Sequence, residues 1–534
     1  MSSLVSTGCV VRDTNRQTRL IWTVPRQRRE KIDPSDISVT LTKYDQEAQC
    51  IDWLDRIAIG YLVLPVSIFF VGWCKPWAAA VLICAVAWLV SPLFRHKVRS
   101  SHLGIPLGTA ALCITVAAVW AYIGGIGHFR YTNSDWLIRD AVLRDLVVSP
   151  WPVGYGEYQG QETLLRTTVA YFLPAAALGK LFGLQATQTL LFLWTAVGAG
   201  LFLMQVSTLT PQGKTAIVTT LLVVTLFSGM DIVGNLLNWD GYFISTWHID
   251  NHLEWWAEDY QYSSITTQLF WVPNHALGGW LYTGLLLRNK RETYELLPVT
   301  LVSLLLWSPL ALIGVLPFAL WRYFGSLRTD GCLGGISLAA WLGAILVLVP
   351  LVVYVSVDLE GYKKGIISLG STAVARELQF FFLEVGIVGL ITYVLRPSAA
   401  LVIALLVLLF LPVGYFGAGN DLVMRSSIPS LAVLVVTVCS ALAAPVESDR
   451  ARLLKVLLIV ILCIGAVTPM EEIARSFVQP RWDARSDVTL VGASCGQYWH
   501  HYIAKLDHSA VRYFLREPTA LPLGPKRSEW CGGP

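Results

Sequence analysis

The sequence predicts an all-α polytopic membrane protein of about 12–13 transmembrane helices, and three observations indicate that class. Of the 534 residues, 54% are hydrophobic and only 14% are charged. Soluble domains carry about 25% charged residues. The mean hydropathy is +0.56. Apolar runs of about twenty residues, the length that crosses a bilayer as a helix, recur along most of the chain.

The same composition excludes several classes of function. The net charge is only +4, and no basic cluster alternates with aromatic residues in a polar region, so nucleic acid is not an expected partner. No Walker or dinucleotide-binding glycine motif stands out. The first 55 residues are polar and lack the basic and apolar regions of a cleavable signal peptide. We interpret residues 1–55 as a cytoplasmic extension.

The first spans are expected at residues 56–74 and 77–94. Three basic residues follow at once, and short loops rich in Lys and Arg face the cytoplasm. Residues 104–124 then cross outward and lead into the polar loop 126–166. Because most connections are only about 4–6 residues long, we interpret this loop as an active-site element.

The next region gives two conflicting signals. Three apolar stretches precede the polar residues 231–263, and a span over 264–287 then ends on Arg288, Lys290 and Arg291. The basic cluster places 231–263 outside, whereas three full spans would place it inside. We therefore expect one of the three stretches, 168–182, 187–206 or 215–230, to be re-entrant, or a further break to lie within this region.

The remaining spans follow the same rule. Residues 296–321 are interrupted at Ser308–Pro309 and are expected to form a hairpin of two broken helices. The membrane domain is expected to occupy residues 56–467, with the tail 468–534 outside. Four charged loops would then share the outer face: 126–166, 231–263, 358–376 and 414–425. Loops on one face are either simply polar or parts of one composite site, and we favour the site.

In the first loop, Asp135 is the predicted general base. A carboxylate can accept the proton of an attacking hydroxyl group. Asp135 with Arg139, and Asp140 with Arg144, also have the i,i+4 spacing of surface ion pairs. The position of Asp135 at the start of a helical run suits a helix cap as well.

A family resemblance begins at the same residues. The chain reads Asp135-Trp, Arg144-Asp-Leu and Trp151-Pro-Val, and continues with Tyr171-Phe-Leu-Pro and Leu178-Gly-Lys-Leu-Phe-Gly. This pattern resembles the bacterial membrane glycosyltransferases of the GT-C superfamily. The resemblance implies transfer of a sugar from a polyprenyl-phosphate-linked donor to a glycan, lipid or protein acceptor. It also implies a helical first outer loop whose catalytic acid matches Asp135. Two spans before residue 104 depart from the family, whose acidic loop usually follows the first span.

The second outer loop is dense in aromatic and acidic residues. Aromatic rings at a membrane surface form either an interfacial belt or platforms for sugar rings. The candidate sugar- or acceptor-binding residues are Asp140, Trp239, Asp240, His248, Asp250, His252, Glu254, Trp255, His275 and Asp421.

Histidines and cysteines leave alternatives open. His248 and His252 are four residues apart, as in a helical metal site, but they lack a clear third ligand; interfacial hydrogen bonding is the alternative. We therefore expect no required cofactor and assign no metal ligand. His275 falls within a span, where an ionisable residue is either functional or a hydrogen-bonded core residue. Cys495 and Cys531 are expected to form a disulfide if the tail lies in an oxidising compartment.

Cationic residues complete the predicted site. Arg425 follows Asp421 at the outer end of a span, where it would bind a lipid phosphate or pair with that carboxylate. Lys363, Lys364 and Arg376 are further phosphate candidates.

The prediction is therefore a multi-pass glycosyltransferase of the bacterial inner membrane, embedded in membrane lipids, with its site facing outward. The alternatives are a polysaccharide polymerase or ligase, which would rely on Arg and His, and a transporter or lipid flippase.

Overall fold

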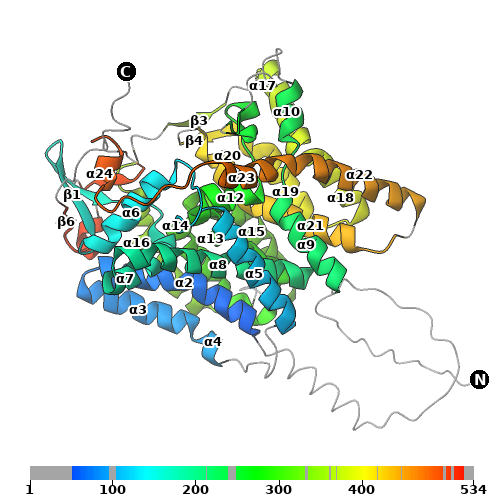
Figure 1. Cartoon of the computed structure of the whole chain (residues 1–534). Helices are drawn as coiled ribbons and strands as arrows, with labels where there is room; N and C mark the ends of the chain where they lie inside the picture. The colour runs from blue at the N-terminus through cyan, green and yellow to red at the C-terminus, as the bar shows by residue number, and fades with distance from the viewer. Residues whose placement is uncertain are drawn as a thin grey trace, which may run out of the picture. The chain divides into compact units, whose positions relative to one another are not determined.

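The computed structural model describes residues 51–95, 104–211, 213–237, 248–249, 251–330, 335–359, 363–367, 370–417, 419–446, 448–496, 499, 501–506 and 510–521 (Figure 1). The predicted extension 1–55 lies outside this part of the chain, except for residues 51–55. The first long helix begins within it, at Trp53.

Helices dominate, which confirms the all-α polytopic class. Nine segments of the described residues are long and apolar enough to cross a membrane: Trp53–Trp73, Pro76–Arg95, Leu184–Leu209, Lys214–Leu237, Pro309–Arg328, Leu338–Ser356, Ser371–Leu395, Asp421–Ala443 and Asp449–Val478. Four apolar helical segments are shorter: Leu107–Ile123, Leu173–Phe182, Thr293–Trp307 and Ala399–Val413. The predicted number of about 12–13 spans exceeds nine because it counted as crossings three of these shorter segments and residues 264–287, which fold as two consecutive helices.

The helices within these segments carry the labels of Figure 1. Their bounds are α2 (Trp53–Trp73), α3 (Pro76–Val90), α4 (Pro92–Arg95), α5 (Leu107–Ile123), α7 (Leu173–Phe182), α8 (Leu184–Leu209), α9 (Lys214–Leu226), α10 (Asp231–Leu237), α14 (Leu297–Trp307), α15 (Pro309–Asp330), α16 (Leu338–Ser356), α17 (Ser371–Phe381), α18 (Ile387–Leu395), α19 (Ala399–Phe410), α20 (Asp421–Ser426), α21 (Ile428–Ala443), α22 (Asp449–Gly465) and α23 (Val467–Val478). The π-helix η4 (Phe382–Gly386) joins α17 to α18.

Other short helices are α6 (Trp136–Val148), α12 (Ile265–Trp271), α13 (Pro273–Arg288), α24 (Leu490–Ala493) and α25 (Val511–Phe514). The 3-10 turns are η1 (Val169–Tyr171), η2 (Leu253–Ala257), η3 (Arg291–Leu296) and η5 (Leu411–Val413).

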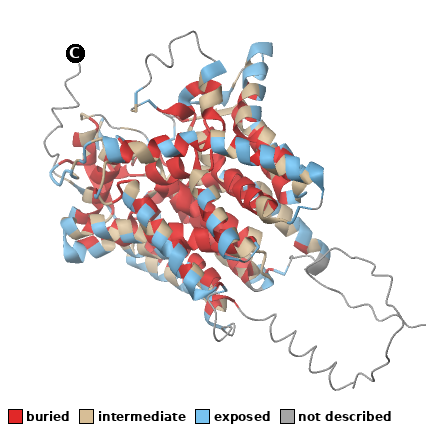
Figure 2. Ribbon diagram, turned by 45° about the vertical axis from the view of Figure 1, so that its right-hand side comes forward, coloured by how far each residue is buried: buried red, intermediate tan, exposed pale blue. Residues whose placement is uncertain are grey.

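The core is built around α8, which packs against α5, α7 and α13. Buried residues, red in Figure 2, concentrate in the centre of the helix bundle, and exposed residues lie on its outer helices. Gly198 and Gly200 allow this packing, because a Cβ on either would collide with Tyr61 of α2 or Ile114 of α5. Small residues let helix backbones approach closely, which stabilises packing between membrane helices.

A buried ion-pair cluster joins one end of several helices. Arg288, the last residue of α13, donates to Asp55 at 2.7 Å and to Asp52 at 3.0 Å, next to the start of α2. Its guanidinium also bonds Thr208 near the end of α8. We call this the Arg288 end of the bundle; the charge rule predicts that it is cytoplasmic.

The structure of residues 168–182 explains why the number of apolar stretches and the basic cluster place residues 231–263 on different sides of the membrane. Helix α7 has ten residues, and η1 precedes it. Ten helical residues span about 15 Å, half of a bilayer core of about 30 Å. Helix α7 is therefore too short to cross, and the two remaining spans carry the chain to the side that the basic cluster requires.

The predicted broken hairpin is present as α14 and α15, which meet at Ser308. Tyr282 of α13 donates to the carbonyl of Leu297 at the start of α14. Arg322 of α15 donates to the carbonyl of Leu286 at 3.1 Å, so the hairpin returns to the Arg288 end.

The opposite end, which we call the loop face, carries two small sheets that the sequence did not predict. Strands β1 (Val153–Tyr158) and β2 (Gln161–Leu165) form a hairpin within the first loop. The tail adds β5 (Ile503–Lys505), antiparallel to β2, and β6 (Thr519–Ala520), parallel to β1. Strands β3 (Lys364–Ile366) and β4 (Gly414–Phe416) pair the third and fourth loops. Only the first part of the first loop, α6, is therefore helical.

The predicted topology leads to a labelling result. A cysteine replacing Glu157, exposed in the first loop, should react with a membrane-impermeant maleimide added to whole cells, above the wild-type background. A cysteine replacing Arg95, exposed at the end of α4, should react only after the membrane is permeabilised. The reverse pattern would contradict the orientation inferred from the basic clusters.

Candidate functional site

The predicted base, Asp135, lies immediately before α6 on the loop face. Its side chain is 48% exposed and accepts a hydrogen bond from Arg139 at 3.1 Å. Among the described residues, its carboxylate caps no helical N–H group; the side chain of Asn133 instead accepts from the Asp135 amide. The ion-pair alternative is thus present, the capping alternative is not, and one face of the carboxylate is open to solvent.

Arg139 is a buried residue with unsatisfied hydrogen-bond donors, which indicates a binding site for an anion. It is 5% exposed, and its Nη2 binds Asp135. Its Nε and Nη1 are buried and find no hydrogen-bond partner within the described part of the chain. An unsatisfied buried donor is costly, and a charged one more so. An anion that accepted these two N–H groups would remove that cost.

A second acid–arginine pair lies on α20, at the end of a span. Arg425 binds Asp421 at 2.9 Å with the predicted i,i+4 spacing. The neighbouring Asn420 donates to the carbonyls of Asp259 and Gly414 and so fixes the start of α20 against the second loop and against β4 of its own loop. Arg425 remains 27% exposed in its side chain, so part of its guanidinium is accessible.

Both acid–arginine pairs lie near one residue of the tail, Tyr502. Burial raises the pKa of Tyr502, and four charged groups lie close enough to act on it: Arg139, Asp135, Arg425 and Asp421. The Tyr502 carbonyl accepts from the amide of Arg166, next to β2. Charged groups of the first loop and of α20 therefore both act on one phenol of the tail. Sequence reasoning missed Tyr502 because nothing local marks it.

His275 is affected by both arginines of these pairs. It is buried, and its Nδ1 lies 2.9 Å from the hydroxyl of Ser308 at the tip of the α14–α15 hairpin. The charges of Arg425 and Arg139 both act on it. The core-histidine alternative therefore describes its bonding, while the two charges indicate that it lies near the arginines.

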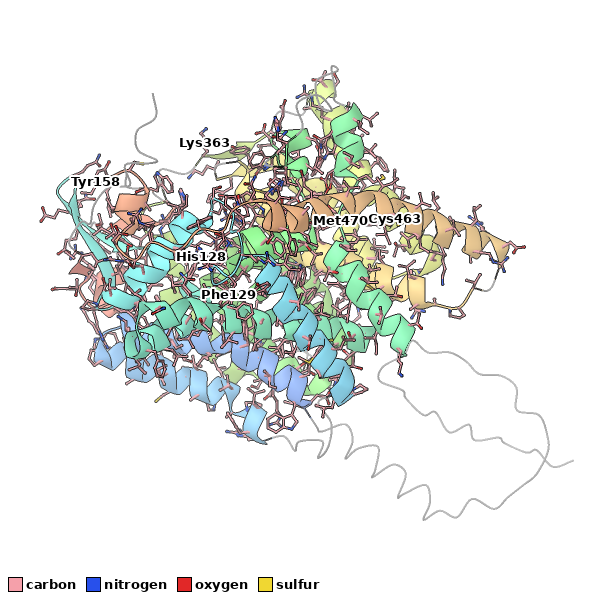
Figure 3. The ribbon with its side chains drawn as sticks, viewed as in Figure 1. His128, Phe129, Tyr158, Lys363, Cys463 and Met470 are labelled. Carbon is pink, nitrogen blue, oxygen red and sulfur yellow. The ribbon has the colours of Figure 1, made fainter. Side chains whose placement is uncertain are left out.

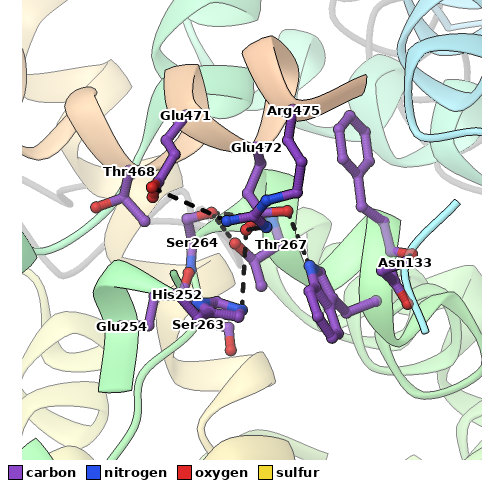
Figure 4. A network of polar contacts seen from close by, with 12 residues as sticks. Asn133, His252, Glu254, Ser263, Ser264, Thr267, Thr468, Glu471, Glu472 and Arg475 are labelled. Atoms are coloured by element: carbon purple, nitrogen blue, oxygen red, sulfur yellow. Dashed lines mark hydrogen bonds and ion pairs between the residues drawn. The ribbon is translucent and has the colours of Figure 1, made fainter. Parts of the chain in front are cut away.

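His252 lies in a buried polar network on the underside of α23 (Figure 4). Its Nε2 is 3.8 Å from Glu472, which binds Arg475 at 2.5 Å. Arg475 also donates to the carbonyls of Ile249 and Asn251 and so holds the second loop. Burial lowers the pKa of His252 to about 4, so the ring is neutral at physiological pH.

The metal interpretation of the second loop gains no support from this geometry. His252 faces Glu472, and His248 is exposed. No group of three or more His, Cys, Asp or Glu side chains is arranged to hold a metal in the described ranges. Trp239, Asp240 and Asp250 lie outside those ranges.

Two predicted sugar ligands are buried and hydrogen-bonded within the protein. Asp140 is 4% exposed and bonds His128 at 2.7 Å and Gln188 at 3.0 Å. Glu254 is 1% exposed and accepts from the amide of Ser264 at 2.8 Å; burial raises its pKa to about 8. Both carboxylates hold loops in place in this structure, and their role as sugar ligands stays a prediction. Trp255, by contrast, is 60% exposed and stacks on His252.

The alternative of an i,i+4 ion pair between Asp140 and Arg144 is not seen among the described residues. Arg144 instead binds Asp145 at 2.9 Å, and Asp145 accepts from the amide of Leu490 in α24 and from the Tyr155 hydroxyl. Burial raises the pKa of Asp145 to about 6. A fully enclosed carboxylate with three donors fastens the tail to α6.

Three weaker phosphate candidates lie away from the convergence. Lys363 and Lys364 are exposed beside the β3–β4 sheet. Figure 3 shows Lys363 at the rim of the loop face, well separated from His128. Arg376 is 72% exposed and lies 3.6 Å from Glu258, which is also exposed. None of the three is among the charged groups that act on Tyr502, whereas Arg139 is. Their role in phosphate binding stays a prediction.

Cys495 is disulfide-bonded, as predicted for the tail. Its predicted partner, Cys531, lies outside the described residues.

The His128–Asp140 pair joins the first loop to the tail, because His128 Nδ1 also contacts the Trp482 carbonyl at 3.0 Å. Burial acts to lower the pKa of His128, but the hydrogen bond and charge of Asp140, with help from Trp482 and Asp483, raise it overall. A raised folded-state pKa gives stability that is complete below the unfolded value of about 6.5 and is lost as pH rises through the folded value.

This pair predicts a pH-dependent stability difference. The melting temperature of wild type minus that of His128→Asn should be largest near about pH 5 and should shrink toward about pH 9. This range of pH covers the titration of a histidine. Thermal unfolding across that range measures it, with exposed His248→Asn as the control. A difference that stays constant with pH would contradict an imidazolium–carboxylate pair.

Comparison with known families, characterised proteins and solved structures finds no match for this chain.

Proposed function

We propose that this protein is an integral membrane glycosyltransferase that takes a sugar from a polyprenyl-phosphate-linked donor. The observation that carries the proposal is the convergence at the loop face of a half-exposed carboxylate, Asp135, with the guanidinium groups of Arg139 and Arg425. A base beside two cations suits the transfer of a glycosyl group away from a phosphate.

The proposed reaction is a single displacement. Asp135 accepts the proton of an acceptor hydroxyl group as its oxygen attacks the anomeric carbon. The bond between that carbon and the phosphate oxygen breaks, and both electrons leave with the phosphate. Arg139 and Arg425 stabilise the negative charge that grows on the leaving group. Attack opposite the phosphate inverts the anomeric configuration.

The Asp135–Arg139 bond suggests an order of events. Before the donor binds, Arg139 holds the carboxylate at 3.1 Å and keeps two buried N–H groups unsatisfied. A donor phosphate would accept from those N–H groups and draw Arg139 toward itself. The carboxylate would then be free to receive the acceptor proton. Donor binding thus prepares the base.

The location proposed for this reaction is the outer side of the bacterial inner membrane, where the acceptor is a glycan, lipid or protein. The exposed ring of Trp255 offers a flat surface on which a sugar could lie.

Transfer, rather than transport, can be tested directly. Protein purified in detergent should release polyprenyl phosphate from lipid-linked sugars when a suitable acceptor is supplied, as detected by mass spectrometry. Protein in liposomes should carry no sugar or lipid-linked sugar across the bilayer. Flux without release of the carrier phosphate would overturn the proposal in favour of a transporter or flippase.

Arg425→Ala should weaken donor binding by about three- to tenfold. The loss is modest because the guanidinium is partly exposed and already paired with Asp421, and screened ion pairs contribute little. Equilibrium binding of a radiolabelled donor lipid measures it. Unchanged affinity in folded Arg425→Ala protein would remove Arg425 from the phosphate site.

A further inference from the structure

A crevice lies at the Arg288 end of the bundle, on the far side from the loop face. It is formed by α13, η3, the α14–α15 hairpin and the beginning of α16, and it is open on one side. Most of its walls are apolar, with Leu297 and Leu301 on one side and Ile336 on another. The proposed glycosyl transfer makes no use of it.

Two donors in the crevice wall lack acceptors. Arg322 Nη2 donates to the carbonyl of Leu286, but Arg322 Nε is buried without a hydrogen-bond partner among the described residues. The indole Nε1 of Trp341 is likewise buried, and no acceptor for it occurs in the described ranges. The Trp341 ring lies edge-on to Tyr323 at 5.5 Å, which fixes its direction.

Arg322 lies over the ring of Trp321, 4.8 Å from its centroid, but it lacks the carboxylate partners that nearby cations have. Arg288 and Lys290 both form ion pairs with Asp52 and Asp55. No carboxylate lies within ion-pair distance of Arg322 in the described part of the chain. A cation and an indole N–H, both unsatisfied and set among apolar walls, match a ligand with an anionic head and an apolar chain.

We propose that this crevice binds an anionic glycerophospholipid from the leaflet at the Arg288 end. The lipid phosphate accepts from Arg322 Nε and Trp341 Nε1, and one acyl chain lies along Leu297 and Leu301. The location favours a lipid over a soluble anion, because arginine side chains near the ends of membrane helices meet the headgroup layer. The site is independent of the proposed glycosyl transfer and of its donor.

Lipid titration of the delipidated full-length protein, followed by native mass spectrometry, tests this site. Three probes with matched chemistry are used: phosphatidylglycerol, diacylglycerol with the same chains, and inorganic phosphate. Phosphatidylglycerol should bind saturably, diacylglycerol at least about tenfold more weakly, and phosphate should not displace the lipid. The tenfold figure corresponds to the loss of a hydrogen bond to a charged group.

Two variants and one control make the result specific. Arg322→Gln should weaken phosphatidylglycerol binding by about tenfold or more, and Trp341→Phe, which removes one neutral donor, by a few-fold. Arg328→Gln, an exposed arginine on the same helix, should bind like wild type. Melting temperatures without lipid show that each variant is folded.

Three outcomes would overturn the proposal. Equal lipid affinity in wild type and Arg322→Gln would remove the phosphate contact. An equal loss in Arg328→Gln would indicate only diffuse attraction to the basic end of the bundle. Displacement of the lipid by inorganic phosphate would identify a site for a free anion instead.

Discussion

Asp135→Asn should lower the single-turnover rate of sugar transfer by about 10²–10⁴-fold, the range expected when a general base is lost. The substitution keeps the size of the side chain and its ability to accept from Arg139, but removes the ability to take a proton. Donor affinity should not weaken, because Arg139 then loses a charged competitor for the phosphate. Rapid-quench measurement with saturating donor separates the chemical step from binding.

Asp421→Asn is the matched control, since Asp421 forms the same kind of i,i+4 pair with Arg425. It should retain the transfer rate within a few-fold. A wild-type rate in folded Asp135→Asn protein would disprove the base assignment. A large fall in both variants would indicate that the two carboxylates act by holding arginines.

Arg139→Gln should weaken donor binding by about 10–100-fold. The buried guanidinium offers two free N–H groups, and hydrogen bonds to charged groups contribute about 1.5–3 kcal/mol. The donor affinity of Arg139→Lys should lie between those of wild type and Arg139→Gln, because lysine keeps the charge but not the paired donors. Inhibition by polyprenyl phosphate gives the affinity for the leaving group alone and should weaken in parallel.

Arg376→Gln, which changes an exposed arginine of the third loop, is the control and should leave donor affinity unchanged. Because Arg139 is buried, each variant also needs its melting temperature measured. Wild-type donor affinity in folded Arg139→Gln would show that the unsatisfied guanidinium serves another ligand. An equal loss in Arg376→Gln would indicate general attraction to a basic surface.

The membrane helices could be predicted from the sequence because their signal is local. Runs of apolar residues and adjacent basic clusters mark the spans, and the Ser308–Pro309 break marks the hairpin. The same charge rule required one short segment, which is α7. Strands β5 and β6 could not be predicted, because pieces of two or three residues carry no alternating pattern and pair only with a distant hairpin.

The site was predictable only in part, for a related reason. The charged spacing around Asp135 indicated its ion pair with Arg139, but only tertiary packing makes Arg139 buried and partly unsatisfied. Arg144 could pair with Asp140 or with Asp145. It pairs with Asp145, which the tail encloses. Tyr502 and His128 are single residues whose roles come from contacts hundreds of positions away.

The sheet shared by the first loop and the tail constrains how the protein can be made. Residues 153–165 leave the ribosome well before their partners in β5 and β6, which follow α23 in the chain. The candidate membrane helices can therefore insert before that sheet closes, and the loop face stays unfinished until the residues of β5 and β6 have been synthesised. Long-range pairing of this kind is slow to form. A nonsense mutation after α23 would therefore leave a fully inserted chain whose first loop lacks its strand partners and Tyr502.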